Sequence, residues 1–203
     1  AGLGGGSADA AAVLRGLRAL FSLPLGDEAL RELALPLGAD VPFCVSGGTM
    51  LAEGIGEVLS PLPPMPPCHL VIVKPPCGSS TKAVYAALSL KALRPWEQPD
   101  ARLLENALRG QNVTLLGASL QNALEKPATE LQPVLLDYRQ FLTESGAAGA
   151  AMSGSGSAFF AVFPEAERDK AEQCIATGKK QFPAAAFFLC RPVSAEEVSA
   201  STI

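Results

Sequence analysis

A run of glycines and other small residues leads directly into a helical pattern near the start of the chain. The run is Gly2-Leu3-Gly4-Gly5-Gly6-Ser7, and apolar residues then recur at helical spacing from Ala10 to Phe21. Glycines let a backbone adopt positive φ and approach a ligand closely, while the first turn of a helix offers unpaired N–H groups at the positive end of its dipole. The run therefore predicts a site for an anion such as phosphate. A flexible glycine-rich segment is the plain alternative, because a glycine run alone is a weak signal.

Two known classes of phosphate site can be compared with this run. A P-loop requires a lysine after its glycines, and no lysine occurs among the first 60 residues, so that class is excluded. A dinucleotide-binding loop requires Gly-x-Gly-x-x-Gly after a strand, with an acidic residue about 20 positions later. Gly2, Gly4, Ser7 and Asp27 fit this pattern loosely, but no strand pattern precedes the run and no βαβ pattern follows it. Dinucleotide binding by an oxidoreductase is therefore the lower-ranked interpretation.

A single carboxylate occupies the segment Gly38-Ala39-Asp40-Val41-Pro42. Proline disfavours helical geometry in the residue before it, so we expect Val41 to be extended and Asp40 to lie at a junction between a helix and a strand. A carboxylate held at such a junction can accept the proton of a substrate hydroxyl. Asp40 as an ordinary turn or capping residue is the competing interpretation.

A second small-residue motif reads Met152-Ser153-Gly154-Ser155-Gly156-Ser157. Such a segment is usually a flexible linker. Apolar residues flank it on both sides, over 146–152 and 158–163, and this favours a loop held between core segments.

The elements that must position these residues follow from the apolar periodicity. Ser7 is placed to cap the first helix, which Pro24 and Gly26 should end. We expect a second helix from Asp27, as its N-cap, to about residue 34, and a strand over residues 41–51 with a tight turn at Gly47-Gly48.

A proline-rich segment, residues 59–67, predicts a stiff connection between domains at 1–60 and 61–203. Beyond it we expect strands at 69–73, 157–163 and 185–190, and helices from a cap at Ser79 or Ser80, at 101–108, at 128–142 and from 164 to about 176. Strands and helices in this arrangement indicate an α+β fold.

Composition narrows the classes of function. The 203 residues carry 16 Lys plus Arg against 20 Asp plus Glu, and a net charge of −4 makes nucleic acid an improbable main partner. Glycines, prolines and charges interrupt every apolar run, so no membrane span is expected. His69 is the single histidine, which argues against a histidine-rich metal site, and five cysteines without a Cys-x-x-Cys pair indicate a reducing compartment.

Three segments together resemble the GHMP kinase family. They are GLGGGSADAAAVL at 2–14, GADVPFCVSGGTMLAEGIGE at 38–57 and MSGSGSAFFAVF at 152–163. The resemblance implies a two-domain fold, with 1–60 the remainder of an ATP-binding N-terminal domain and 61–203 a C-terminal domain built as a ferredoxin-like α/β sandwich. Three glycines followed by Ser7 and Ala8, together with GADVP, resemble the branch that acts on a cytidine-diphosphate-linked methylerythritol in the non-mevalonate isoprenoid pathway.

The resemblance implies ATP-dependent phosphorylation of the 2-hydroxyl of that small molecule, with Mg²⁺. Asp40 matches the family's catalytic aspartate and would contact the substrate, as would Thr81, Tyr85 and the residues Gly154, Ser155 and Gly156. The residues that would wrap the ATP phosphates are Ala1, Gly2, Leu3, Gly4, Gly5, Gly6, Ser7 and Ala8. Tyr85 would stack on the cytosine ring, although an ordinary place in a helix core is a competing interpretation.

The family places a catalytic lysine on a segment before its glycine loop. Residues 1–60 carry three basic groups against seven acidic ones, so we expect these 203 residues to be an N-terminally truncated form with little or no activity. A GHMP-fold protein that binds a metabolite without turnover is the alternative from another class of function. The pathway implies bacterial cytoplasm or plastid stroma, and the oligomeric state stays open.

Overall fold

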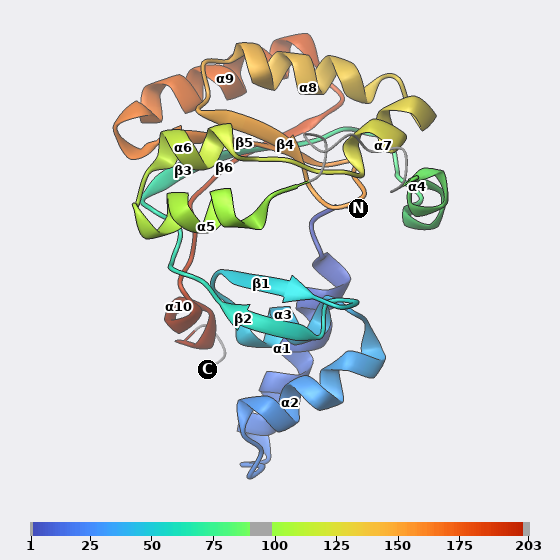
Figure 1. Ribbon diagram of the computed structural model, residues 1–203, viewed down its shortest axis with the longest axis vertical. Helices are drawn as coiled ribbons and strands as arrows, with labels where there is room; N and C mark the ends of the chain where they lie inside the picture. Colours follow the sequence, from blue (N-terminus) through green and yellow to red (C-terminus); the bar gives the residue numbers. More distant parts are fainter. Residues whose placement is uncertain (1, 90–98, 201–203) are drawn as a thin grey trace. The chain divides into compact units, whose positions relative to one another are not determined.

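The computed structural model describes residues 2–89 and 99–200, which form two compact units (Figure 1). The helical unit comprises Gly4–Pro64 and the residues from Val193 onward, and the sheet unit comprises Met65–Pro192 and the first residues up to Leu3. The units therefore divide within the proline-rich segment, and the end of the chain returns to the helical unit, which the local sequence pattern did not indicate. The division into family domains at residues 60 and 61 stays a prediction.

Three helices pack together in the helical unit. They are α1 (Gly5–Leu20), α2 (Asp27–Ala34) and α3 (Val41–Ser46), with a short 3₁₀ turn, η1 (Leu35–Leu37), between α2 and α3. Their buried apolar side chains form one small core made of Ala11, Leu30, Ala34, Val41 and Val45. The first two helices confirm the helical spacing found in the sequence. The expected N-caps are each displaced, because α1 begins after Gly4 rather than Ser7, and α2 begins after Gly26 rather than Asp27.

The expected strand over residues 41–51 is wrong, because most of this segment forms α3. Pro42 lies in the first turn of α3, where a helix needs no N–H donor, so the proline starts the helix rather than preventing it. Val41 is accordingly helical and buried. Gly47, with φ of 67°, ends α3, and the chain continues into a hairpin of β1 (Met50–Glu53) and β2 (Val58–Pro61).

The last described residues form α10 (Ala195–Ala200), which packs closely against the turn after α3. A Cβ atom added to Gly47 would lie 3.2 Å from Val198 Cβ, and one added to Gly48 would lie 3.3 Å from Ala195 Cβ. The glycine pair therefore serves a close helix contact, in addition to the turn expected from the sequence.

The sheet unit contains a four-stranded antiparallel sheet in the order β4-β5-β3-β6 (Figure 1). The strands are β3 (Cys68–Lys74), β4 (Gly149–Met152), β5 (Phe159–Pro164) and β6 (Ala186–Cys190). Numbered within the unit this order is 2-3-1-4, which is the ferredoxin-like arrangement that the family resemblance implied. The α+β fold class is confirmed.

Helices cover both faces of this sheet (Figure 1). On one face, α8 (Leu135–Glu144) and α9 (Arg168–Gln181) bury the main core with Val71, Phe159 and Phe163, and 3₁₀ turn η4 (Glu165–Glu167) precedes α9. On the other face, α6 (Val113–Ala118) crosses the start of β4, next to α5 (Ala101–Arg109). Two shorter helices, α4 (Thr81–Ala87) and α7 (Glu125–Leu131), complete the unit.

Most expected elements of this unit are present, with four differences. The helix expected over 128–142 is two helices, α7 and α8, because Pro133 interrupts the helical hydrogen bonds between them. Residues 149–152, for which no strand was expected, form β4, and α6 was not expected. The helix expected from residue 164 begins at Arg168. Among the described residues, no helix is both long and apolar enough to span a membrane.

Candidate functional site

The glycine run forms an open turn at the start of α1. Gly4 is the N-cap residue, with φ of 61° and ψ of 20°, and no side chain caps the helix. Ser7 lies inside the first turn and does not cap it, contrary to expectation. A Cβ atom added to Gly4, Gly5 or Gly6 would have no heavy atom within 4 Å. The three glycines therefore leave room beside the first turn of a 16-residue helix, as the close approach of an anion requires.

The beginning of the glycine run contacts the Gly/Ser motif within the sheet unit. Gly2 has φ of 80°, and an added Cβ atom would lie 3.0 Å from both Ser153 O and Gly156 O. Ser153 Oγ donates a hydrogen bond of 2.5 Å to Gly2 O. Gly2 therefore belongs with the Gly/Ser motif in the sheet unit, and a glycine is required there for close packing as well as for its backbone conformation. Ala1, also predicted for the phosphate site, lies outside the described residues.

Asp40 lies at the start of α3 with its side chain exposed to solvent. Its backbone is helical, with φ of −86° and ψ of −10°, and its carboxylate makes no capping hydrogen bond to α3. Asp40 therefore lies in a turn, as the competing interpretation expected, but its side chain does not cap α3. The turn between β1 and β2 packs against Ala39, the residue before Asp40, because a Cβ atom added to Gly56 would lie 2.9 Å from Ala39 O. Packing at Ala39 and burial of Val41 and Pro42 hold the backbone of Asp40 while its carboxylate stays accessible.

One arginine connects the helix that follows the glycine run with the helix that follows Asp40. Arg15 of α1 donates from Nη1 to Cys44 O at 2.5 Å, near the end of α3. Burial raises the pKa of the Cys44 thiol, the Asp40 carboxylate raises it further, and the Arg15 guanidinium lowers it. Asp40 and Arg15 therefore both act on the same thiol, and the two predicted motifs belong to one packed body of helices.

The predicted substrate residues of the sheet unit form a hydrogen-bonded group. Thr81 Oγ1 and Ser155 Oγ lie 2.9 Å apart, and Ser79 Oγ donates to Ser155 O at 2.6 Å. Tyr85 lies one helical turn beyond Thr81 on α4 and is 58% exposed, so its ring is available to a ligand rather than part of the core. Gly154 is exposed, whereas Ser155 and Gly156 are buried. The structure therefore brings Thr81 and the Gly/Ser motif together.

Further polar residues that the sequence did not single out hold the Gly/Ser motif in place. Asn122 Nδ2 donates to Met152 O and Gly154 O, each at 2.8 Å, and Glu125 Oε2 accepts from Met152 N at 2.9 Å. Lys74 Nζ donates to Ser157 Oγ at 2.9 Å. None of these residues lies in a recognisable motif, apart from Ser157 at the end of the Gly/Ser run. Their roles depend on contacts between segments distant in sequence, which local patterns do not indicate.

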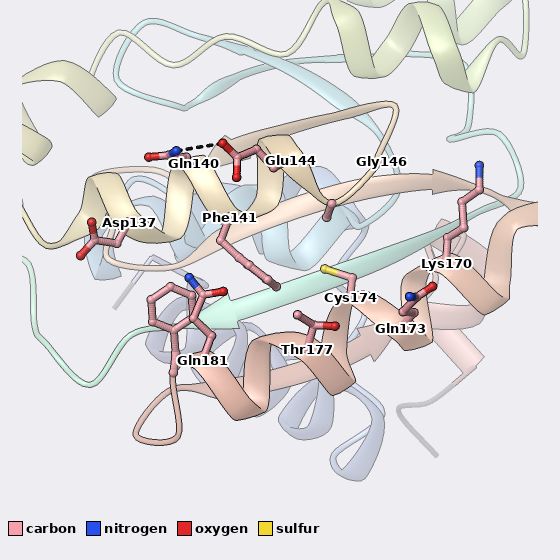
Figure 2. A pocket seen from close by; sticks show the side chains of 12 residues that line it. Asp137, Gln140, Phe141, Glu144, Gly146, Lys170, Gln173, Cys174, Thr177 and Gln181 are labelled. Carbon is pink, nitrogen blue, oxygen red and sulfur yellow. Dashed lines mark hydrogen bonds between the residues drawn. The ribbon is translucent and has the colours of Figure 1, made fainter.

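A cavity of about 830 Å³ lies between α8 and α9, away from these residues (Figure 2). Its rim carries Asp137 and Glu144 from α8 and Lys170 from α9, and Phe141 and Cys174 line its apolar part. Lys170 is already paired with a neighbouring glutamate on its own segment, since its Nζ lies 2.8 Å from Glu167 Oε1. None of the predicted site residues lines this cavity, which lies between two helices on the same face of the sheet.

Comparisons with known proteins agree with the three motifs. Residues 1–48 match the GHMP kinases N terminal domain, and residues 98–182 match GHMP kinases C terminal. A 4-diphosphocytidyl-2-C-methyl-D-erythritol kinase of Carboxydothermus hydrogenoformans is 45% identical over 84% of this chain and 59% of that protein. The kinase of the same name from Exiguobacterium sibiricum is 46% identical over 80% of this chain and 56% of that protein. The chain thus spans less than two thirds of the length of these relatives.

Solved structures show the same likeness. The crystal structure of a 4-(cytidine 5'-diphospho)-2C-methyl-D-erythritol kinase matches with a TM-score of 0.73 and 36% identity, over 96% of this chain and 67% of that one. A homoserine kinase from Cytophaga hutchinsonii matches with a TM-score of 0.72 and 22% identity, over 88% of this chain and 61% of that one, and shows the fold alone. From its motifs, its sheet order and these matches, the chain belongs to the GHMP kinase family.

Proposed function

We propose that this protein phosphorylates the 2-hydroxyl of 4-diphosphocytidyl-2-C-methyl-D-erythritol with ATP. The substrate is inferred from the names of the relatives above. The observation that best supports phosphoryl transfer is the exposed carboxylate of Asp40, which makes no capping hydrogen bond. Phosphoryl transfer needs positioning, charge stabilisation and one group that accepts the proton of the attacking hydroxyl. A carboxylate whose backbone is held by packing and whose side chain is exposed to solvent meets the last of these requirements.

The remaining residues divide between the two ligands. The N–H groups of the first turn, which follow Gly4, lie at the positive end of α1 beside glycines with room around them, and they would bind the phosphates of ATP. Thr81, Tyr85 and Ser155 would bind the cytidyl substrate, with the hydroxyls as hydrogen-bond partners and the exposed ring as a stacking surface for cytosine. Asp40 would accept the proton of the substrate's 2-hydroxyl while that hydroxyl's oxygen bonds to the γ-phosphorus of ATP. The bond from the γ-phosphorus to the bridging oxygen would break at the same time and release ADP.

Mg²⁺ would neutralise charge on the phosphates during transfer. Among the described residues, no three side chains of the kinds that bind metals cluster together. Mg²⁺ in nucleotide enzymes is usually held by one or two carboxylates together with the phosphates of the substrate. Because the phosphates of ATP can supply much of the coordination, the described residues are compatible with a magnesium–ATP complex although they form no such cluster.

Two other functions are less well supported. A dinucleotide-dependent oxidoreductase would require a parallel βαβ unit around the glycine run, whereas the strand pairings of the described residues are antiparallel. A family member that binds a metabolite without turnover has no specific observation in its favour, because the Asp40 carboxylate remains accessible.

The substrate is tested by offering several acceptors to the protein translated from its complete reading frame. ATP, Mg²⁺ and either 4-diphosphocytidyl-2-C-methyl-D-erythritol, homoserine or mevalonate are incubated with the protein, and ³¹P NMR follows the products. We expect ADP and a new phosphomonoester at the 2-position only when the acceptor is the cytidyl compound. Transfer to homoserine or mevalonate at a comparable rate would overturn the proposed substrate, and binding of the cytidyl compound without transfer would favour the inactive binder.

A further inference from the structure

Lys74, the last residue of β3, has its ammonium group surrounded by oxygen atoms of two loops. Nζ donates to Pro75 O at 2.7 Å, to Cys77 O at 2.9 Å and to Ser157 Oγ at 2.9 Å. An ammonium group has three donors, and these three acceptors use all of them. Lys74 therefore connects the loop after β3 with the Gly/Ser motif between β4 and β5.

Ser157 reinforces the same connection from the opposite loop. It is fully buried, and its Oγ donates to Cys77 O at 2.6 Å. Cys77 O thus accepts hydrogen bonds from both Lys74 and Ser157, so the two side chains and this carbonyl form one closed group. All three acceptors of Lys74 are neutral oxygens, and partial burial of a charge among neutral groups costs desolvation free energy. A purely structural link between neutral groups would avoid this cost.

The same two loops carry the predicted substrate residues a few positions further on. After Cys77 come Ser79 and Thr81, which bond to the backbone and the side chain of Ser155. In the other loop, Ser155 lies two positions before Ser157, the residue that Lys74 contacts. The hydrogen bonds of Lys74 and Ser157 with Cys77 O therefore hold the two loops in the conformation in which Thr81 and Ser155 meet.

We propose that Lys74 is a positioning residue for the substrate side of the reaction, which rests on the function proposed above. Its ammonium holds the Gly/Ser motif against the loop after β3, and thereby sets the geometry with which Thr81 and Ser155 receive a nucleoside-diphosphate substrate. Lys74 itself contacts neither the reacting atoms nor the phosphates of ATP, because its three donors are occupied.

The test compares steady-state kinetics of Lys74→Met and Ser157→Ala with those of Lys179→Met, a matched removal of an exposed lysine on α9. We expect Lys74→Met to raise KM for the cytidyl substrate about tenfold, with KM for ATP changed less than about twofold. Ser157→Ala should act in the same direction, and the double variant should be little worse than either single variant, since both remove one shared link. Lys179→Met should match the parent protein.

A second measurement separates this inference from the proposed function. The amide of Gly156 donates to Ser153 O at 3.0 Å inside the motif, so its hydrogen exchange reports whether the motif keeps its conformation. We expect exchange at Gly156 to be about tenfold faster in Lys74→Met, with exchange in α8 and α9 unchanged. If the parent protein does not phosphorylate the cytidyl compound, the proposed function fails, yet the exchange result still decides the link. Unchanged exchange at Gly156, or equal changes in both KM values, would overturn the role of Lys74.

Discussion

At the scale of single residues, the structure shows where the residues of the sequence motifs lie, and several of their local conformations differ from the expected ones. Asp40 is accessible as a base requires, but it precedes a helix rather than a strand, because Pro42 occupies a first-turn position that a helix tolerates. Gly2 was assigned to phosphate binding, and its contacts with Ser153 and Gly156 show a packing role as well. Lys74 and Asn122 gave no signal, since their importance comes from hydrogen bonds across 83 and 30 positions of sequence.

Gly56 provides a test of how the segment around Asp40 is held. Its φ of 117° strains any other residue, and an added Cβ atom would press on Ala39 O at 2.9 Å. Gly56→Ala should therefore destabilise the protein by about 2 to 4 kcal/mol, combining backbone strain with displacement of neighbouring backbone.

Gly146→Ala is the matched control for this substitution. Gly146 also has a positive φ, of 80°, but an added Cβ atom would meet nothing within 4 Å. We expect it to cost only about 1 to 2 kcal/mol, the strain alone. Urea unfolding measures both variants, and equal losses would show that the contact with Ala39 does not hold the Asp40 segment.

At the scale of elements, apolar periodicity located helices and strands wherever one face is buried. α1, α2, α5 and β3 follow that pattern closely, and their bounds agree with the expected ones within a few residues. β4 was missed because its sequence, Gly-Ala-Ala-Met, has no β-branched residue and no alternation. Its position in the sheet depends on pairing with β5 and on close packing by α6, neither of which is a local property.

The close contact between α6 and β4 predicts that alanine is not tolerated at Gly117. Gly117 of α6 packs its backbone directly on the backbone of Ala148 and Gly149, leaving no space for a Cβ atom. Gly117→Ala should lower the free energy of unfolding by about 3 kcal/mol, since α6 would have to move away from the sheet.

Gly16, in the middle of α1, has open space around it. Gly16→Ala should raise the free energy of unfolding by about 0.5 to 1 kcal/mol through helix propensity alone. Denaturant unfolding with a probe for each unit, such as hydrogen exchange of α1 and of β4, measures the two effects. A neutral Gly117→Ala would mean that α6 does not approach β4 as described.

At the scale of the whole molecule, the α+β class and the ferredoxin-like sheet order agree with the family resemblance. Which segments of the chain form each unit could be predicted only in part. The proline-rich segment indicated where they divide, but the return of the residues after Val193 to the helical unit involves a close contact of α10 with Gly47 and Gly48. Such a contact joins residues about 150 positions apart in sequence, and no local pattern encodes it.

Buried thiols predict how stability depends on pH. Burial raises the pKa of Cys174 above its ordinary value of 9.0, opposed by a hydrogen bond from Ser145, and burial also raises the pKa of Cys68 and of the Tyr138 hydroxyl. These groups ionise in the unfolded chain at lower pH than in the folded protein. The free energy of unfolding that they contribute is therefore fully present below about pH 9 and is lost as the pH rises beyond that value.

We expect the melting temperature under reducing conditions to fall between pH 8.5 and 10.5, and to fall less steeply in Cys174→Ala. Cys190→Ala, at a half-buried position in β6, is the control and should keep the slope of the parent protein. Identical slopes in the Cys174→Ala and parent proteins would show that this thiol does not contribute to the pH dependence.

The central claim is that Asp40 accepts a proton during phosphoryl transfer from ATP to the cytidyl substrate. The most direct measurement is the kcat and ATP affinity of Asp40→Asn, in the protein translated from its complete reading frame. Asp27→Asn is the control, because it changes an exposed carboxylate of the same unit that pairs with Arg18. We predict that Asp40→Asn lowers kcat by about 10² to 10⁴ with ATP affinity unchanged, whereas Asp27→Asn leaves both unchanged. An Asp40→Asn protein with the kcat of the parent would contradict the account.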